Sequence, residues 1–147
     1  MQIKYASTLA FSEDLRKVAL VKKNRPSWLA GKWNAIGGNI EHGEIPVAAA
    51  MRELAEEAGL YVDNYQRMLP FARIEWAGQA ACQMYATIVP NIDFARTKTD
   101  ETVMVWTVST LPAYYCDLSD DLCALVEMAR MALRSPSKVF FVQQVSR

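Results

Sequence analysis

The sequence has few of the residues that form disulfide frameworks or thiol metal sites. Its three cysteines, Cys82, Cys116 and Cys123, are odd in number and lack the spacing of a metal site. Reduced and mostly buried thiols are therefore expected, as in a cytoplasmic protein. The single histidine, His42, lies in a glycine-containing loop and is interpreted as an exposed turn residue rather than a catalytic one.

The formal net charge is zero, because 16 basic residues are balanced by 16 acidic residues. No overall field would attract a nucleic acid polymer or an anionic membrane, so neither is an expected partner. No apolar run reaches the length of a membrane-spanning helix, and the first residues lack the layout of a secretory signal. A cytoplasmic location is expected.

The length and composition favour one compact domain. With 147 residues, of which 52% are hydrophobic, the chain can bury a sizeable single core. The sequence shows no internal repeat, low-complexity tract or linker. We predict a single domain over residues 1–147, and nothing in the sequence indicates its oligomeric state.

Glycine and glutamate are concentrated in one stretch, residues 38–60, which reads GNIEHGEIPVAAAMRELAEEAGL. Pro46 suits the first turn of a helix, and the residues after it are strong helix formers. Gly59 suits the left-handed position just beyond a helix end. These signals predict a helix between Pro46 and Gly59.

The carboxylates of this predicted helix fall on one face. Glu53, Glu56 and Glu57 are three and four residues apart, and Glu44 lies near the helix start. Carboxylates gathered in this way repel one another unless cations hold them, and Mg²⁺ prefers oxygen ligands. The alternative is a solvated acidic face, which fits poorly because acidic residues late in a helix oppose its dipole.

Segments rich in β-branched and aromatic residues predict strands at residues 3–11, 18–21, 65–77, 82–89, 103–108 and 139–145. Pro70 is expected at an edge position or a β-bulge. Trp28, Leu29 and Trp33 are expected to anchor the loop after the second strand to the core. Strands on either side of two helices indicate an α/β fold.

The second helix is predicted to begin after Ser119. A serine is a good N-cap, and the next two residues, Asp120 and Asp121, suit a first helical turn. Leu122, Leu125, Val126, Ala129 and Leu133 would form its buried stripe.

The glycine-glutamate stretch resembles the signature of the Nudix hydrolases. The matching residues are Gly38, Glu44, Arg52, Glu53, Leu54, Glu56, Glu57, Gly59 and Leu60, with no departure inside the signature. The resemblance implies a Nudix-type α/β/α sandwich, with a mixed β-sheet between helices. It also implies an enzyme that hydrolyses a nucleoside diphosphate linked to another group. Ile36 stands just before the paired glycines, where the family often has proline.

The resemblance also implies roles for these residues. Glu56 and Glu57 would be metal ligands, Glu53 a ligand or the general base, and Glu44 an outer contributor. The backbone carbonyl of Gly37 or Gly38 would complete the metal shell. The expected cofactor is Mg²⁺, with Mn²⁺ as the alternative.

Two further residues belong to the predicted catalytic set. Arg52 is expected to orient a glutamate through a bidentate pair rather than to contact substrate. Glu101 corresponds to an acidic residue that reaches the metals in similar family members, although by sequence alone it is a loop glutamate. The glycines Gly37 and Gly38 would allow close backbone approach or a positive φ, in the site or in an ordinary tight turn.

In its candidate substrate-binding residues, the sequence resembles the MutT-type enzymes, which hydrolyse oxidised purine nucleoside triphosphates. Asn34 matches an asparagine that reads the purine edge, and an amide offers a donor and an acceptor together. Asp120 and Asp121 match two aspartates that bind the base, although a helix start favours them without any ligand. Leu118 and Ser119 stand where that subgroup has an aromatic residue.

Positive charge for the phosphates would come from Lys23 or a neighbouring basic residue, which could equally be solvated loop charges. Three functions remain open. The first is a Mg²⁺-dependent hydrolase that converts a nucleoside triphosphate to the monophosphate and pyrophosphate. The second is a pyrophosphatase for ADP-ribose, nucleotide sugars or dinucleotides. The third is a catalytically silent nucleotide-binding module.

Overall fold

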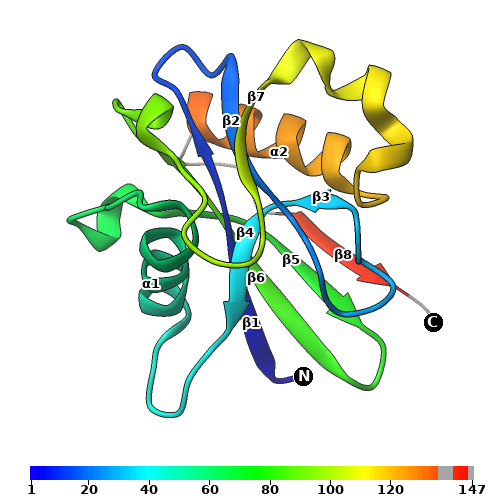
Figure 1. Ribbon diagram of the computed structural model, residues 1–147. Helices are drawn as coiled ribbons and strands as arrows, with labels where there is room; N and C mark the ends of the chain where they lie inside the picture. Colours follow the sequence, from blue (N-terminus) through cyan, green and yellow to red (C-terminus); the bar gives the residue numbers. More distant parts are fainter. Residues whose placement is uncertain (136–140, 146–147) are drawn as a thin grey trace.

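The structure of the protein is a computed structural model that describes residues 1–135 and 141–145. Its elements (Figure 1) are β1 (Ile3–Phe11), β2 (Lys17–Lys22), β3 (Trp33–Asn34), β4 (Ile36–Asn39), α1 (Pro46–Ala58), β5 (Leu69–Trp76), β6 (Ala80–Ile88), β7 (Val103–Thr107), α2 (Leu122–Arg134) and β8 (Phe141–Val145). Three 3₁₀ segments lie at Tyr65–Arg67, Ile92–Phe94 and Val108–Asp117. Within the described ranges, no helix is long and apolar enough to cross a membrane.

Strand β1 lies at the centre of a mixed sheet. It pairs in parallel with β6 and antiparallel with β2 and β4. The strand order is β3-β2-β1-β6-β5-β8, with β4 paired to β1 and β7 paired to β2. Strands β5 and β8 are also parallel. The predicted α/β fold class with a mixed sheet is confirmed.

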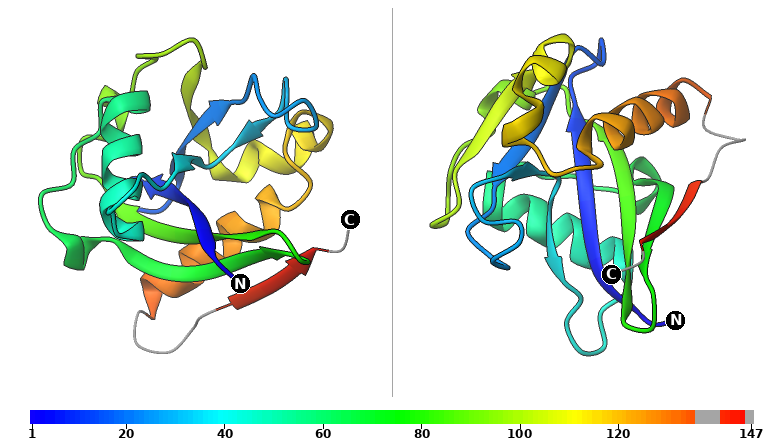
Figure 2. Two further views of the ribbon diagram at one scale, coloured as in Figure 1. Left: turned by 90° about the horizontal axis from the view of Figure 1, so that it is seen from below. Right: turned by 90° about the vertical axis from the view of Figure 1, so that its right-hand side faces the viewer.

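The two long helices cover opposite faces of this sheet, as Figure 2 shows. On β6, Met84 belongs to the apolar cluster that includes the buried stripe of α2, whereas Tyr85 belongs to a cluster that includes residues of α1. Successive residues of a strand point to opposite faces, so the two clusters lie on the two sides of the sheet. The predicted sandwich is confirmed.

Strand β1 changes its partner along one edge. Residues 5–8 pair with β4, whereas Ala10 and Phe11 pair with β2. Strands β2 and β4 therefore leave the same edge of β1 at different points and separate from each other. The chain segments that line the candidate site are attached to these two diverging strands.

The strand predicted at residues 65–77 is shorter in the structure. Strand β5 begins at Leu69, because residues 65–67 form a 3₁₀ turn that the Asn64 side chain caps, accepting the Gln66 N–H at 2.8 Å. The bulge expected at Pro70 is confirmed by a register shift between Pro70 and Ala72. Of the predicted last strand, residues 139 and 140 lie outside the described residues.

The predicted N-cap role of Ser119 is wrong. Helix α2 begins at Leu122 with Asp121 at the N-cap, where no side-chain capping bond forms. Ser119 instead donates its backbone N–H to the Trp33 carbonyl at 3.0 Å, so it extends the sheet beside β3. The expected anchoring by Trp28 is also wrong, because this side chain is 48% exposed, while Trp33 is buried.

Gly37 is required by the close approach of β4 to β1. It pairs with Ser7, and a Cβ at Gly37 would lie 2.2 Å from the Ala6 carbonyl oxygen and 2.5 Å from the Ser7 Cα. These atoms belong to the backbone of the central strand and cannot move aside. Neither Gly37 nor Gly38 has a positive φ, and both lie in a strand rather than in a tight turn.

Gly37→Ala should therefore destabilise the fold by about 2–4 kcal/mol, because the new methyl group forces β4 away from β1. Urea denaturation followed by circular dichroism would measure the change. Gly38→Ala is the matched control, since its Cβ would meet only the far end of the Glu53 side chain. A loss of stability equal in the two variants would contradict this explanation.

Candidate active site

Helix α1 is fixed at both ends by local sequence. Pro46 occupies its first turn without needing an N–H partner, and Gly59 ends it in the left-handed conformation with a φ of 66°. The Gly59 N–H donates to the Ala55 carbonyl at 3.0 Å. Leu54 and Ala58 are buried against the sheet, and this packing places Glu53 and Glu57 at the edge of a cleft.

The cleft has a volume of about 970 Å³ and is lined from both diverging strands. Its polar part includes Gly37 and Gly38 on β4, Glu53 and Glu57 on α1, Lys23 after β2, Asn34 on β3 and Glu101 before β7. These residues are separated by up to 78 positions in the chain. The fold therefore brings together most of the residues that the sequence analysis singled out.

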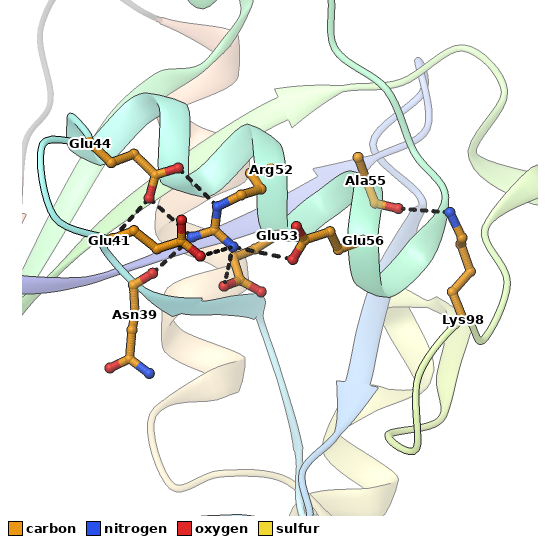
Figure 3. Close-up of polar contacts among 8 residues, drawn as sticks. All are labelled: Asn39, Glu41, Glu44, Arg52, Glu53, Ala55, Glu56 and Lys98. Carbon is orange, nitrogen blue, oxygen red and sulfur yellow. Dashed lines mark hydrogen bonds and ion pairs between the residues drawn. The ribbon is translucent and has the colours of Figure 1, made fainter.

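Arg52 lies outside the cleft lining and binds the acidic side chains beside it (Figure 3). Its Nε and Nη2 donate to the two carboxylate oxygens of Glu44 at 2.9 and 3.0 Å. Its Nη1 donates to Glu53 at 2.9 Å and to Glu56 at 3.2 Å. The bond from Arg52 lowers the pKa of Glu44, and Glu44 in turn raises the pKa of the guanidinium.

Glu53 and Glu56 share one nitrogen of Arg52 but differ in their exposure. Glu53 lines the cleft while it also accepts from Arg52, so the guanidinium fixes one of its oxygens. The Glu56 side chain is 57% exposed and is not part of the described cleft lining. Glu44 also lies outside the lining, held by the same guanidinium.

Glu57 is the buried acid of the site. It is 8% exposed, and its Oε2 atom has no hydrogen-bond partner among the described residues. Burial raises the pKa of this carboxyl to about 7, while the charge of Lys23 opposes the rise and the charges of Glu53, Glu101 and Glu56 add to it. A buried carboxylate oxygen without a partner is costly, and it is the position where a cation would gain most.

Lys23 supplies positive charge inside the cleft. Its Nζ donates to Glu101 at 2.9 Å, and both side chains are largely buried. The second oxygen of Glu101 accepts from the Asn24 backbone N–H. The structure thus brings Glu101 close to the acidic residues of α1, whereas the sequence alone left its place in the site open. It also places Lys23 among these acids as a counter-ion.

Gly38 permits the close contact between β4 and Glu53. A Cβ at this position would lie 2.6 Å from Glu53 Oε1. The backbone of β4 therefore runs directly beside the carboxylate, and a side chain would occupy that space. This contact gives Gly38 a physical reason for being glycine that differs from the one at Gly37.

Asn34 lies in the same cleft, whereas the two aspartates do not. The Asp120 side chain is 88% exposed and pairs with Lys32 at 3.7 Å. Asp121 sits at the N-cap of α2, without a capping bond. Neither aspartate is in the described lining, so the structure does not bring this predicted pair to the cleft as it brings Asn34.

The sequence analysis missed the apolar wall of the cleft. Tyr5 and Trp76 meet edge to face with ring centroids 5.9 Å apart, and Cys82 and Met84 on β6 continue the wall. Burial raises the pKa of Cys82 to about 11, so its thiol stays neutral. These residues alternate along strands as core residues do, and this pattern does not distinguish a core from a cleft wall.

The sequence that carries Gly38, Arg52 and the glutamates can be compared with known protein families. Residues 2–111 match the family model of the NUDIX domain, which is more than half of the chain. The protein belongs to the Nudix family. Members of this family generally use divalent metal cations.

Curated relatives of this Nudix chain share short segments with it. One is named oxidized purine nucleoside triphosphate hydrolase, from Mus musculus, and is 39% identical over 61 residues, 42% of this chain and 38% of the relative. Another is named putative 8-oxo-dGTP diphosphatase 2, from Mycobacterium tuberculosis, and is 49% identical over 45 residues, 31% of this chain and 32% of the relative. The matched segments thus span less than half the length of these relatives.

Solved structures share the whole fold at low sequence identity. A Nudix hydrolase from Nitrosomonas europaea superposes with a TM-score of 0.72 at 18% identity, over 100% of this chain and 81% of the other. The NUDIX domain of Shewanella oneidensis NrtR, solved with ADP ribose, gives a TM-score of 0.70 at 19% identity, over 90% and 89% of the two chains. These likenesses establish the fold alone.

The donor set of the Nudix cleft fits a hard divalent cation in its chemistry. Glu53, Glu57 and Glu101 offer carboxylate oxygens, and Glu57 has the oxygen without a protein partner. Within the described residues, however, no three acidic, histidine or cysteine side chains already converge as a metal group. Glu101 is paired with Lys23 instead.

The raised pKa of Glu57 predicts a pH-dependent stability. Its ordinary value is 4.5 and its value in the fold is about 7, so the folded state binds the proton more tightly. The stability from this group is complete below a pH of about 4.5 and is lost as the pH rises through about 7. Between about pH 5 and pH 8 the wild type should lose roughly 2–3 kcal/mol more than Glu57→Gln, which cannot ionise.

Urea denaturation with a metal chelator at the two pH values would measure this difference. Glu127→Gln, on the exposed face of α2 across the sheet, is the matched control, because it removes a carboxylate that is not among the charges acting on Glu57. Equal pH dependence in the wild type and Glu57→Gln would show that the buried carboxyl does not titrate as described.

Proposed function

We propose that this chain, as a single domain over residues 1–147, is a Mg²⁺-dependent hydrolase that converts a nucleoside triphosphate to the monophosphate and pyrophosphate. One observation carries the proposal: a single cleft joins the buried acids Glu57 and Glu101 to Asn34, which can bind a base. Acidic side chains around a phosphate site need a cation, and an amide beside an apolar wall suits a heterocyclic base.

The metal would be held by Glu57, Glu53 and Glu101 together with the Gly38 carbonyl, and by Glu56 if it leaves Arg52. When bound, it would neutralise phosphate charge and polarise the bond to be cleaved. Mn²⁺ satisfies the same oxygen donors. Glu53, fixed on one side by Arg52, is the candidate general base for the attacking water.

Two basic residues have different tasks in this proposal. Arg52 is a positioning residue, because all its recorded partners are protein oxygens of Asn39, Glu41, Glu44, Glu53 and Glu56. Lys23 lies inside the cleft beside Glu101 and would offer its ammonium group to a phosphate oxygen of the substrate.

The names of the curated relatives support an oxidised purine as the base. Both act, by name, on oxidised purine nucleotides, one of them on 8-oxo-dGTP. Their matched segments are short, so the base is the part of the proposal that needs the most direct test. The second candidate substrate is ADP-ribose, which is present in the structurally similar domain of NrtR.

A product analysis with Mg²⁺ would separate these candidates. The panel contains ordinary and oxidised nucleoside triphosphates, ADP-ribose, dinucleotides and nucleotide sugars. Preferred cleavage of a triphosphate with release of pyrophosphate supports the proposal. Preferred cleavage of ADP-ribose or a nucleotide sugar would be consistent with the proposed role of the acidic residues but would reject a nucleoside triphosphate as the substrate. Binding without turnover on the whole panel would indicate a nucleotide-binding module instead.

Glu57→Gln should reduce metal-dependent turnover by about 10²–10³-fold, because the buried carboxylate is the central cation ligand of the proposal. Steady-state kinetics at saturating Mg²⁺ would measure kcat, and circular dichroism would check the fold. Glu127→Gln, on the exposed face of α2, is the control that should leave kcat unchanged. A fully active Glu57→Gln would defeat the metal-ligand assignment.

Asn34→Ala should raise KM by about tenfold for purine nucleoside triphosphates and by less for pyrimidine nucleotides, because a specific base contact is lost. The turnover number should change little, since Asn34 is proposed to bind the base and not the metal. Comparison of KM across four bases would measure this. An equal increase for all four would sink the base-reading role.

A further inference from the structure

The amide of Asn34 is fixed in one orientation. Its Oδ1 accepts from the Ala35 backbone N–H at 2.8 Å. A backbone N–H can only donate, so the carbonyl oxygen rather than the amino group must face it. The Ser119 hydroxyl lies 3.2 Å from the same oxygen and donates to it. Two donors therefore occupy the two lone pairs of Oδ1.

The remaining hydrogen-bonding atom of this side chain is Nδ2. No partner of Nδ2 is recorded among the described residues, and Asn34 lines the cleft. An amide whose oxygen is fully used presents N–H donors only. A ligand atom that binds the Asn34 side chain must then be a hydrogen-bond acceptor, whereas a free amide could bind either a donor or an acceptor.

The position of Ser119 depends on the fold and not on helix capping. Its backbone N–H donates to the Trp33 carbonyl at 3.0 Å, and Leu118 forms a parallel bridge with Trp33. Leu118 is 1% exposed and anchors this segment in the core. The segment thus runs beside β3 and holds the Ser119 hydroxyl against the side chain of the next β3 residue, Asn34.

We propose that Ser119 is a positioning residue that locks the Asn34 amide with its NH₂ group available to the ligand. The site then favours a base with a carbonyl oxygen at the contacted edge, such as a 6-oxopurine, over a base with an amino group there. This inference rests on the proposed nucleotide substrate. The locking of the amide itself can be tested without any substrate.

The first experiment measures the mobility of the Asn34 side chain in the ligand-free protein by ¹⁵N relaxation of its NH₂ group. In the wild type, the NH₂ order parameter should be close to that of the rigid backbone, and in Ser119→Ala it should fall clearly. Ser119→Thr keeps the hydroxyl and should restore the rigid value. Ser109→Ala, at an exposed serine, is the control. Unchanged mobility in Ser119→Ala would overturn the positioning role.

The second experiment compares kcat/KM for dGTP and dATP, which differ in the 6-oxo and 6-amino groups. The wild type should prefer dGTP, and Ser119→Ala should reduce this preference about fivefold, through KM, because the Oδ1 lone pair that Ser119 occupied becomes free to accept from a 6-amino group. Ser119→Thr should recover the preference. A ratio that stays within twofold of the wild type in Ser119→Ala would reject the specificity role.

The two experiments separate the failure of this inference from the failure of the proposed function. If the wild type cleaves no ordinary or oxidised nucleoside triphosphate but Ser119→Ala frees the amide, the proposed substrate is wrong and so is the base preference, while the positioning role is supported. If both nucleotides are cleaved and the amide is equally rigid in Ser119→Ala, the proposed function holds and the Ser119 inference fails.

Discussion

The central constraint in this structure is the repulsion among the carboxylates gathered beside α1. Two cations of the protein itself limit it. Arg52 binds Glu44, Glu53 and Glu56, and Lys23 lies with Glu101 inside the cleft. Glu57 is left with a buried oxygen that has no hydrogen-bond partner among the described residues. The site is thus arranged around a charge that the protein only partly neutralises, and this arrangement suits a cation-dependent reaction.

The sheet explains why these groups meet in a cleft rather than in a core. One stretch of the edge of β1 pairs with β4, and the next stretch pairs with β2. These two strands therefore separate, with Gly38 on β4 and Lys23 just after β2. Gly37 can lie against β1 because it has no Cβ, and Gly38 can lie against Glu53 for the same reason. Two adjacent glycines therefore serve two contacts, one for the fold and one for the site.

The Asn34 side of the cleft shows how tertiary structure can give a residue a role that its local sequence does not predict. By sequence, Ser119 followed by two aspartates has the pattern of a helix start. In the fold, the backbone of Ser119 pairs with Trp33 and its hydroxyl binds Asn34. The helix begins later, at Leu122, and Asp120 remains exposed. Pairing with a strand edge outweighs a capping preference worth only about 1 kcal/mol.

The sequence by itself determined the limits of α1, the family and the acidic residues of the site. Local rules were enough for the helix, because proline and glycine act within one turn. Only the tertiary structure decided which acids face the cleft, since Glu53 lines it while the nearby Glu56 is exposed outside its lining, although both accept from Arg52. It also decided the pairing of Lys23 with Glu101 and of Ser119 with Asn34. These contacts join residues far apart in the chain, and no local pattern encodes which distant side chains a sheet will bring together.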